Sequence, residues 1–179
     1  MPETTVPPTL TAKLASVLTP RAQVYVHVHV DNLNNPNAVA RVEGAEPILV
    51  SQIANLTRAS KVRVTPVVHV GAGSIAVDAY EIPDQIREEV LARDIYEVFP
   101  WSSREARGLD IDHTDPYRSG LPGQTRIGNL GPLSRKAHRI KTHGGWRLKQ
   151  PQPGVFIWRT PAGQQVRVDH AGSHPIDPG

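Results

Sequence analysis

The 179-residue chain contains no cysteine, which excludes disulfide bonds and thiolate ligands to a metal. This absence agrees with a reducing compartment, and we expect a cytoplasmic protein. Aromatic residues make up only 5%, whereas Pro (17) and Gly (14) are abundant, which predicts short elements joined by many turns. No apolar run is long enough to span a membrane, and no secretion signal precedes the first elements, so we expect no membrane partner.

Acidic residues are absent from one long part of the chain. Residues 1–115 carry 10 Lys and Arg against 15 Asp and Glu, whereas residues 116–179 carry 10 Lys and Arg against only Asp169 and Asp177. A face that is merely solvated would interleave acids with these bases. Like charges gathered on a small fold repel one another, so such a block is typical of a surface that faces a polyanion. The pattern favours contact with nucleic acid.

The first half of the chain predicts a small sheet with two short helices, preceded by a flexible arm at 1–20. Histidines on its strands raise the question of a metal site. Because no carboxylate partner is evident beside His27, His29 or His69, we interpret them as ordinary strand residues. Alternating or helical patterns predict strands at 23–30, 38–42 and 61–70, and helices at 51–60 (begun by Ser51) and 84–93 (after Pro83).

A second unit begins near Val98, and its elements follow in the order strand, loop, helix, meander. The pattern predicts a strand that ends at His113, a Gly/Pro-rich loop at 118–128, and a helix that has Pro132 in its first turn and ends before Gly144. The segment "WRLKQPQPGVFIWRTPAGQQVRVD" alternates around two turns and predicts a meander of three strands. Its aromatic residues, Trp146, Phe156 and Trp158, are expected in the core.

The stretch "LDIDHTDPY" and the helix after it contain residues suited to phosphodiester hydrolysis, which needs a base, a cation and a water in line. A neutral imidazole, with an ordinary pKa of about 6.5, lets His113 accept a proton. Asp112 and His138 offer an oxygen and a nitrogen to one divalent cation and leave room for water and phosphate, as Mg²⁺ prefers. Mn²⁺ is the alternative. Asn129 is no base, so we expect it to orient His113 or its loop.

Neighbouring strand residues point to opposite sides, so Asp112 and His113 reach one site only if the strand bends, and Thr114-Asp115-Pro116 supplies a break. We interpret Asp110 and Asp115 as turn or salt-bridge residues. His143, at the helix end, is interpreted as satisfying backbone carbonyls. The bases expected to neutralise phosphates are Arg135, Lys136, Arg139, Lys141, Arg147 and Lys149.

The ordered stretches "DIDHTDPY", "NLGPL" and "AHRIKTH" resemble the His-Asn-His (HNH) nuclease motif of the ββα-metal superfamily. Around them, "GLPGQTRIGNLGPLSRKAHRIKTHGGW" resembles the C-terminal nuclease segment of a large actinobacterial repeat family, in which a domain of unknown function comes first. The stretches "VYVHV", "ARVEG", "VTPVV" and "VDAYEIPDQIRE" resemble the end of that domain. The resemblance covers residues 22–170 and implies a truncated member of the family. It implies an α+β protein with a remnant of that domain at 21–96, an HNH nuclease-like domain with its meander at 97–170, and a tail at 171–179.

The resemblance implies a metal-dependent endonuclease, a hydrolase that cleaves phosphodiester bonds in DNA, with RNA as an alternative partner. Many relatives bind a structural zinc through two Cys pairs. The corresponding positions, around Glu97, Ser102, Ser134 and Ala137, hold no thiol, so no structural zinc is expected. The unit would then rely on apolar contacts of Phe99, Trp101, Leu130, Leu133 and Ile140.

Ala137 also replaces the first of two paired histidines of the family, which would weaken catalysis if that histidine assists the metal. The alternative function is therefore a catalytically weak or inactive nucleic-acid-binding remnant of such a nuclease. A third interpretation, an interaction domain centred on the first sheet, leaves the basic block unexplained. The sequence leaves cleavage specificity and oligomeric state open.

Overall fold

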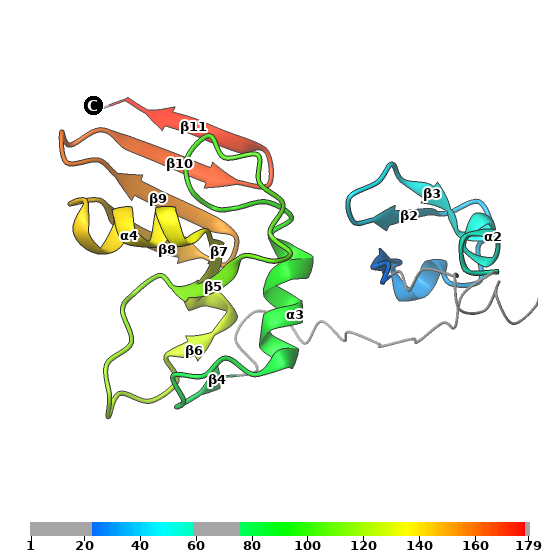
Figure 1. The fold of residues 1–179 in the computed structure, drawn as a ribbon, viewed down its shortest axis with the longest axis horizontal. Helices are drawn as coiled ribbons and strands as arrows, with labels where there is room; N and C mark the ends of the chain where they lie inside the picture. The colour runs from blue at the N-terminus through cyan, green and yellow to red at the C-terminus, as the bar shows by residue number, and fades with distance from the viewer. Residues whose placement is uncertain (1–22, 59–75, 178–179) are drawn as a thin grey trace, which may run out of the picture. The chain divides into compact units, whose positions relative to one another are not determined.

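The computed structural model describes residues 23–58 and 76–177, and the chain divides into two compact units, Met1–Val64 and Thr65–Gly179 (Figure 1). The fold is mixed α+β, as the sequence predicted, with several small antiparallel sheets and, within the described residues, three α-helices. None of the helices in the described ranges combines the length and apolar character that crossing a membrane requires.

The first unit contains a three-stranded sheet with the order β1-β2-β3. The strand predicted at 23–30 is much shorter, because the His29 side chain accepts a hydrogen bond from the Asp31 N–H and the chain turns into a 3₁₀ helix. The expected strand at 61–70 and His69 lie outside the described residues. The elements are β1 (Val26–His27), η1 (Val30–Asn32), β2 (Val39–Val42), β3 (Ile48–Leu49), η2 (Val50–Gln52) and α2 (Ile53–Thr57).

Two sequence expectations change in this unit. Ser51 lies inside η2 and does not begin the helix; instead the Gln52 side chain accepts a hydrogen bond from the Leu49 N–H at 2.8 Å. The expectation that His27 lacks a carboxylate partner is wrong, because its Nε2 lies 2.6 Å from Glu43 Oε1. That carboxylate follows β2, and the pairing of β1 with β2 brings it to the histidine.

The second unit combines two short strand pairs, two helices and a four-stranded meander with the order β11-β10-β9-β8. Strand β4 pairs with β6, and β5 pairs with β7. The elements are β4 (Ala76–Val77), α3 (Asp84–Arg93), β5 (Asp110–His113), β6 (Thr125–Arg126), η3 (Ile127–Asn129), β7 (Leu130–Leu133), α4 (Arg135–His143), β8 (Arg147–Gln152), β9 (Val155–Arg159), β10 (Gln165–Asp169) and β11 (Gly172–Ile176).

Helix α3 covers the strand pair β5–β7 (Figure 1). The helix has the predicted bounds, and its Ile86 and Val90 are fully buried in a cluster with Ile111 and Leu130. This packing places α3 in the second unit. The sequence set the domain boundary at residues 96 and 97, whereas the structure divides the chain earlier, after Val64, because the apolar face of α3 is covered by residues that follow it.

The meander and α4 form a second apolar cluster. Phe156 and Trp158 are buried in it as predicted, with Trp146 partly buried against them. Trp158 also donates a hydrogen bond from Nε1 to the Val98 carbonyl at 2.6 Å. The expectation that Trp101 belongs to this core is wrong, because its side chain is 65% exposed and its backbone turns with a φ of 57°.

The structure corrects two boundaries around the meander. Pro132 does not begin a helix; it pairs with Ile111 inside β7, and its carbonyl accepts a hydrogen bond from the Val98 N–H. The helix starts later because the Ser134 side chain accepts a hydrogen bond from the Ala137 N–H. The predicted tail at 171–179 also contains a fourth strand, β11, which pairs along the whole length of β10.

One glycine sets the spacing between the strand pair and the meander. Gly131 lies in β7 opposite Asp112. A Cβ atom at this position would lie 2.8 Å from a Phe156 ring carbon and 2.9 Å from a Val98 methyl group. Both distances are too short for ordinary contact, so the glycine permits β7 to lie directly on the meander core.

Candidate active site

The order β5, β7, α4 brings the residues of the motif to one end of the second unit. His113 is the last residue of β5 and pairs with Leu130, so Asn129, the last residue of η3, lies beside it just before β7. The Ser134 cap begins α4, and the helix carries His138 past strand β5. Far-apart parts of the sequence thus meet through one antiparallel ladder and one helix cap.

Asp112 and His138 approach each other across β5 and α4. The His138 Nε2 lies 3.6 Å from Asp112 Oδ2, and the Lys141 Nζ lies 2.5 Å from the same oxygen. His138 and Lys141 are three positions apart and share one face of the helix. Lys141 is therefore the cation nearest to Asp112 Oδ2, an oxygen that is itself buried.

Asp112 and His138 supply two ligands that fit the predicted divalent cation. A buried carboxylate oxygen and an imidazole nitrogen 3.6 Å away are suitable ligands for Mg²⁺ or Mn²⁺. Within residues 23–58 and 76–177 no group of three or more His, Asp or Glu side chains could hold a metal. The remaining ligands would therefore be water and phosphate.

Lys141 differs from its expected position at a phosphate-facing surface. Its side chain is only 10% exposed, and the ammonium group also donates a hydrogen bond to the His113 carbonyl at 2.5 Å. It neutralises Asp112 from inside the unit. A divalent cation at Asp112 would compete with this ammonium group.

The imidazole of His113 is 5% exposed and is fixed by Thr125, whose Oγ1 lies 2.8 Å from His113 Nε2. The Thr125 hydroxyl has a single hydrogen, which it donates to the Ala79 carbonyl. It must therefore accept from His113, and we assign the proton of the neutral imidazole to Nε2. This tautomer leaves Nδ1 with a lone pair that accepts a proton.

The side chains of Asp112 and His113 leave β5 on opposite sides. The ladder stays regular through His113, so the predicted break after it comes too late to bring both groups to one side. They still interact through charge. Burial lowers the pKa of His113, the negative charge of Asp112 opposes this shift, and the positive charge of Lys141 adds to it. The imidazole is neutral at physiological pH.

Asn129 holds the loop that follows His113 and does not contact the imidazole. Its Oδ1 accepts from the Asp115 N–H at 2.8 Å, and its Nδ2 donates to the Gln124 carbonyl at 2.9 Å. The Asn129 carbonyl accepts from the Thr114 N–H at 2.8 Å. Asn129 is only 3% exposed, and its hydrogen bonds hold the loop at 114–124 in place from inside the unit.

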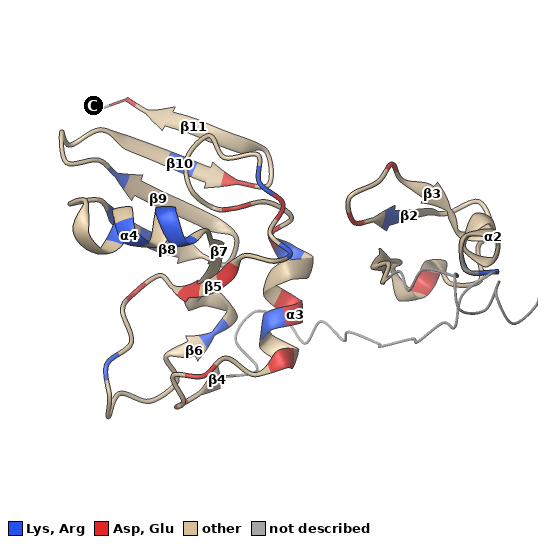
Figure 2. Ribbon diagram, viewed as in Figure 1, with Lys and Arg blue, Asp and Glu red and all other residues tan. Residues whose placement is uncertain are grey.

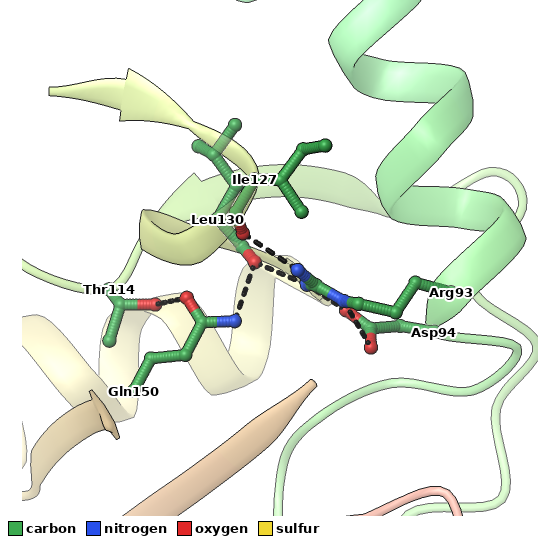
Figure 3. Close-up of polar contacts among 6 residues, drawn as sticks. All are labelled: Arg93, Asp94, Thr114, Ile127, Leu130 and Gln150. Carbon is green, nitrogen blue, oxygen red and sulfur yellow. Dashed lines mark hydrogen bonds and ion pairs between the residues drawn. The ribbon is translucent and has the colours of Figure 1, made fainter. Parts of the chain in front are cut away.

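A partly buried arginine at the end of α3 secures both ends of the turn that contains Asn129 (Figure 3). Arg93 donates to the carbonyls of Ile127 and Leu130, each at 2.7 Å. Asp94 pairs with the same guanidinium group; burial raises the pKa of Asp94, and the arginine opposes that shift. Gln150 donates to the Leu130 carbonyl from the other side, and Thr114 donates to Gln150.

Two tyrosines that the sequence analysis did not single out cover His113. The Tyr80 ring stacks on the imidazole, with 5.8 Å between centroids and 22° between planes, and is itself 72% exposed. The Tyr117 ring lies 5.7 Å from the imidazole, and its hydroxyl donates to the Asp78 carbonyl. No local pattern marks Tyr80, because its position depends on the pairing of β4 with β6.

The basic residues predicted to contact nucleic acid lie on two elements, α4 and β8 (Figure 2). Arg135, Lys136 and Arg139 lie on α4, and Arg135 Nε is 3.7 Å from Asp110 Oδ2. Arg147 and Lys149 alternate on β8 with Leu148, which is buried against α4. They therefore lie on the face of the meander that points away from α4. His143 is the last residue of α4.

Comparison with known proteins yields no match to a family model, a curated protein or a solved structure.

Proposed function

We propose that the second unit is a metal-dependent HNH-type endonuclease that hydrolyses phosphodiester bonds in DNA. The single observation that carries this proposal is the approach of His138 Nε2 to within 3.6 Å of Asp112 Oδ2. The two residues are far apart in the sequence, and only the fold brings them together. Their meeting pairs a carboxylate with an imidazole, two ligand types that a divalent cation accepts, on a helix from the base-rich part of the chain, and so supports a hydrolytic site for a polyanion.

In this proposal His113 is the general base. Its Nδ1 takes a proton from water as the water attacks phosphorus, while Thr125 holds Nε2–H in place. The lowered pKa keeps the base unprotonated at neutral pH. Asn129 fixes the loop after His113 and acts as a positioning residue.

Asp112 and His138 would hold Mg²⁺ or Mn²⁺, and the bound cation would neutralise charge on the phosphate and the leaving oxygen. The Asp112 carboxylate would supply the negative charge that holds the cation, in competition with the ammonium group of Lys141. Ion pairing with Lys141 keeps that oxygen oriented toward α4. The 5% exposure of His113 means that Tyr80 must turn aside before water and substrate reach the imidazole.

A plasmid-nicking assay tests the proposal, with Mg²⁺, Mn²⁺ or chelator. His113→Ala and His138→Ala are compared with the wild type and with His143→Ala, a matched variant at the end of the same helix. We expect cleavage that requires metal, and its loss in the first two variants only. Equal cleavage by all four proteins would remove the catalytic assignment.

The alternative is a nucleic-acid-binding remnant that cleaves poorly. Two observations favour it: the buried imidazole of His113 and the ammonium group of Lys141 on the carboxylate that a metal needs. Salt-dependent DNA binding by a wild-type protein that nicks no plasmid under any metal would select this function.

A further inference from the structure

The meander has a basic outer face. Along its strands, buried residues alternate with exposed ones, and Leu148, Phe156 and Trp158 point to the core shared with α4. The opposite face therefore carries the residues between them. They include Arg147 and Lys149 on β8, Ile157 and Arg159 on β9, and Gln165, Arg167 and Asp169 on β10.

Two of these arginines lie directly opposite each other. Arg147 and Arg159 are cross-strand partners in the β8–β9 ladder, on the same face of the sheet. Like charges at directly opposed positions destabilise a sheet. Arg167, by contrast, lies 2.8 Å from Asp169 on the same strand.

Nothing in the part of the chain that the structure describes offsets the charge of this pair. No carboxylate of residues 23–58 or 76–177 lies within ion-pair distance of Arg147 or Arg159, and neither guanidinium group donates a hydrogen bond there. Arginine presents a planar fork of donors that matches a phosphate group. An external anion would therefore remove the repulsion and satisfy both forks.

The pair borders a shallow depression of about 290 Å³. The depression is walled by the β9–β10 turn, which is tied by the Gly163 N–H to the Thr160 carbonyl at 2.9 Å and by the Gln164 N–H to Thr160 Oγ1 at 3.2 Å. These hydrogen bonds hold this wall of the depression in place. The lining residues are Gly145, Arg147, Arg159, Thr160, Pro161 and Gly163.

We propose that Arg147 and Arg159 form a binding site for a backbone phosphate of a nucleic-acid strand, on the outer face of the meander and separate from the His113 site. The site extends the contact surface of the proposed nuclease, but it does not depend on cleavage. Its ligand is a phosphate diester held by two guanidinium groups, without readout of base sequence.

The binding test uses the full chain and a fluorescent DNA duplex, titrated at several salt concentrations. The variants are Arg147→Gln, Arg159→Gln and the double change, with Arg167→Gln as the control from the same face. We expect the double change to weaken binding several-fold at low salt and to lower the log–log salt slope by about one to two. Arg167→Gln should change both much less, because that guanidinium group is already paired with Asp169. An unchanged slope in the double variant would overturn the proposal.

Two further measurements separate this site from the catalytic one and from free phosphate. His113→Ala should lose nicking but keep the wild-type salt slope, so failure of the catalytic proposal leaves this result intact. Titration with inorganic phosphate, followed by the NMR signals of the arginine side chains, should give only weak shifts. Tight phosphate binding at Arg147 and Arg159 with DNA affinity unaffected by their substitution would assign the site to free phosphate and overturn the nucleic-acid ligand. The melting temperature of the double variant should not fall, because the change removes a like-charge pair.

Discussion

The ammonium group of Lys141 lies 2.5 Å from the Asp112 carboxylate that also faces His138. Lys141 of α4 therefore neutralises Asp112, the carboxylate that would bind a metal together with His138 of the same helix. The two cations cannot both be closest to Asp112 Oδ2. If the proposed metal binds, this competition would link metal affinity to the stability of the unit.

Lys141→Met should therefore strengthen metal binding and weaken the metal-free protein. Without the ammonium group, Asp112 Oδ2 is buried with no counter-charge, which should cost about 1–3 kcal/mol of unfolding free energy. Mn²⁺ should restore this loss, so the rise in melting temperature on adding Mn²⁺ should exceed that of the wild type. Lys149→Met, at an exposed position on β8, is the control. A variant with unchanged stability and unchanged response to Mn²⁺ would show that Lys141 neither stabilises the Asp112 carboxylate nor competes with a metal for it.

Acid should destabilise the protein through His113. Burial lowers the folded-state pKa of His113 below the ordinary value of 6.5, so below pH 6.5 the unfolded chain takes up a proton that the folded chain resists. The contribution of the neutral imidazole is complete above pH 6.5 and declines as the pH falls toward the folded pKa. Urea unfolding of the wild type and of His113→Gln, at several pH values, measures it. The wild type should lose more stability than the variant between pH 6.5 and pH 5; parallel curves would contradict the prediction.

The rate of nicking should depend on the same group and should also fall when His113 is protonated. Because the base must be neutral, the acid limb of kcat/KM should fall below pH 6.5, at the lowered pKa of His113. A profile whose acid limb lies above pH 6.5 would assign the base to another residue.

Thr125→Val should release the imidazole. The change removes the hydroxyl that accepts from His113 Nε2–H and donates to the Ala79 carbonyl. We expect a stability loss of about 1–3 kcal/mol from the unsatisfied buried groups, together with a mixture of His113 tautomers in nitrogen NMR spectra. Ser119→Ala, an exposed hydroxyl in the nearby loop, should do neither. A single, unchanged tautomer in Thr125→Val would show that the hydroxyl does not fix the proton.

Tyr80→Ala should uncover the imidazole. The exposed tyrosine ring stacks on His113, so its removal reduces burial, and the pKa of His113 should rise toward 6.5. NMR titration of the imidazole protons measures this shift. Tyr80→Phe keeps the ring and should keep the wild-type value; Tyr96→Ala, another exposed tyrosine, controls for a general effect. No change in Tyr80→Ala would mean that other groups bury the imidazole.

Arg93→Met should loosen the turn that carries Asn129. It leaves Asp94 without its partner and the Ile127 and Leu130 carbonyls without this donor. Loss of one member of a buried ion pair costs about 3–5 kcal/mol, and the 18% exposure of the Arg93 side chain favours the lower end. Chemical unfolding measures the loss, with Arg104→Met, an exposed arginine, as the control. A loss no larger than that of the control would contradict the prediction.

Local patterns predicted the elements whose own residues determine them. Helix α3 has the predicted bounds because Pro83 precedes it and its apolar positions recur at helical spacing. Strand β5 ends at His113, and Trp158 is buried, as alternation indicated. The assignment of Pro132 to a helix failed because proline suits a first helical turn and an edge strand equally well in sequence alone.

The surroundings of the candidate site could not be read from the sequence, because they come from distant segments. Tyr80 and Ala79 reach His113 and Thr125 only through the pairing of β4 with β6. Arg93 reaches the turn at Asn129 from a helix that the sequence assigned to another domain. Strand β11 has little strand character of its own, since its sequence is Gly-Ser-His-Pro-Ile, and it forms by pairing with β10.

The missing side chain at Gly131 has a practical consequence for anyone who wishes to excise or graft this motif. Phe156 and Val98 approach the backbone of Gly131, opposite Asp112. The residues that cover this face of the strand pair therefore come from outside it. A minimal peptide ending after α4 would expose that backbone to water. A transplant of the motif into a new scaffold should therefore include the β8–β9 hairpin, because its Phe156 covers that backbone.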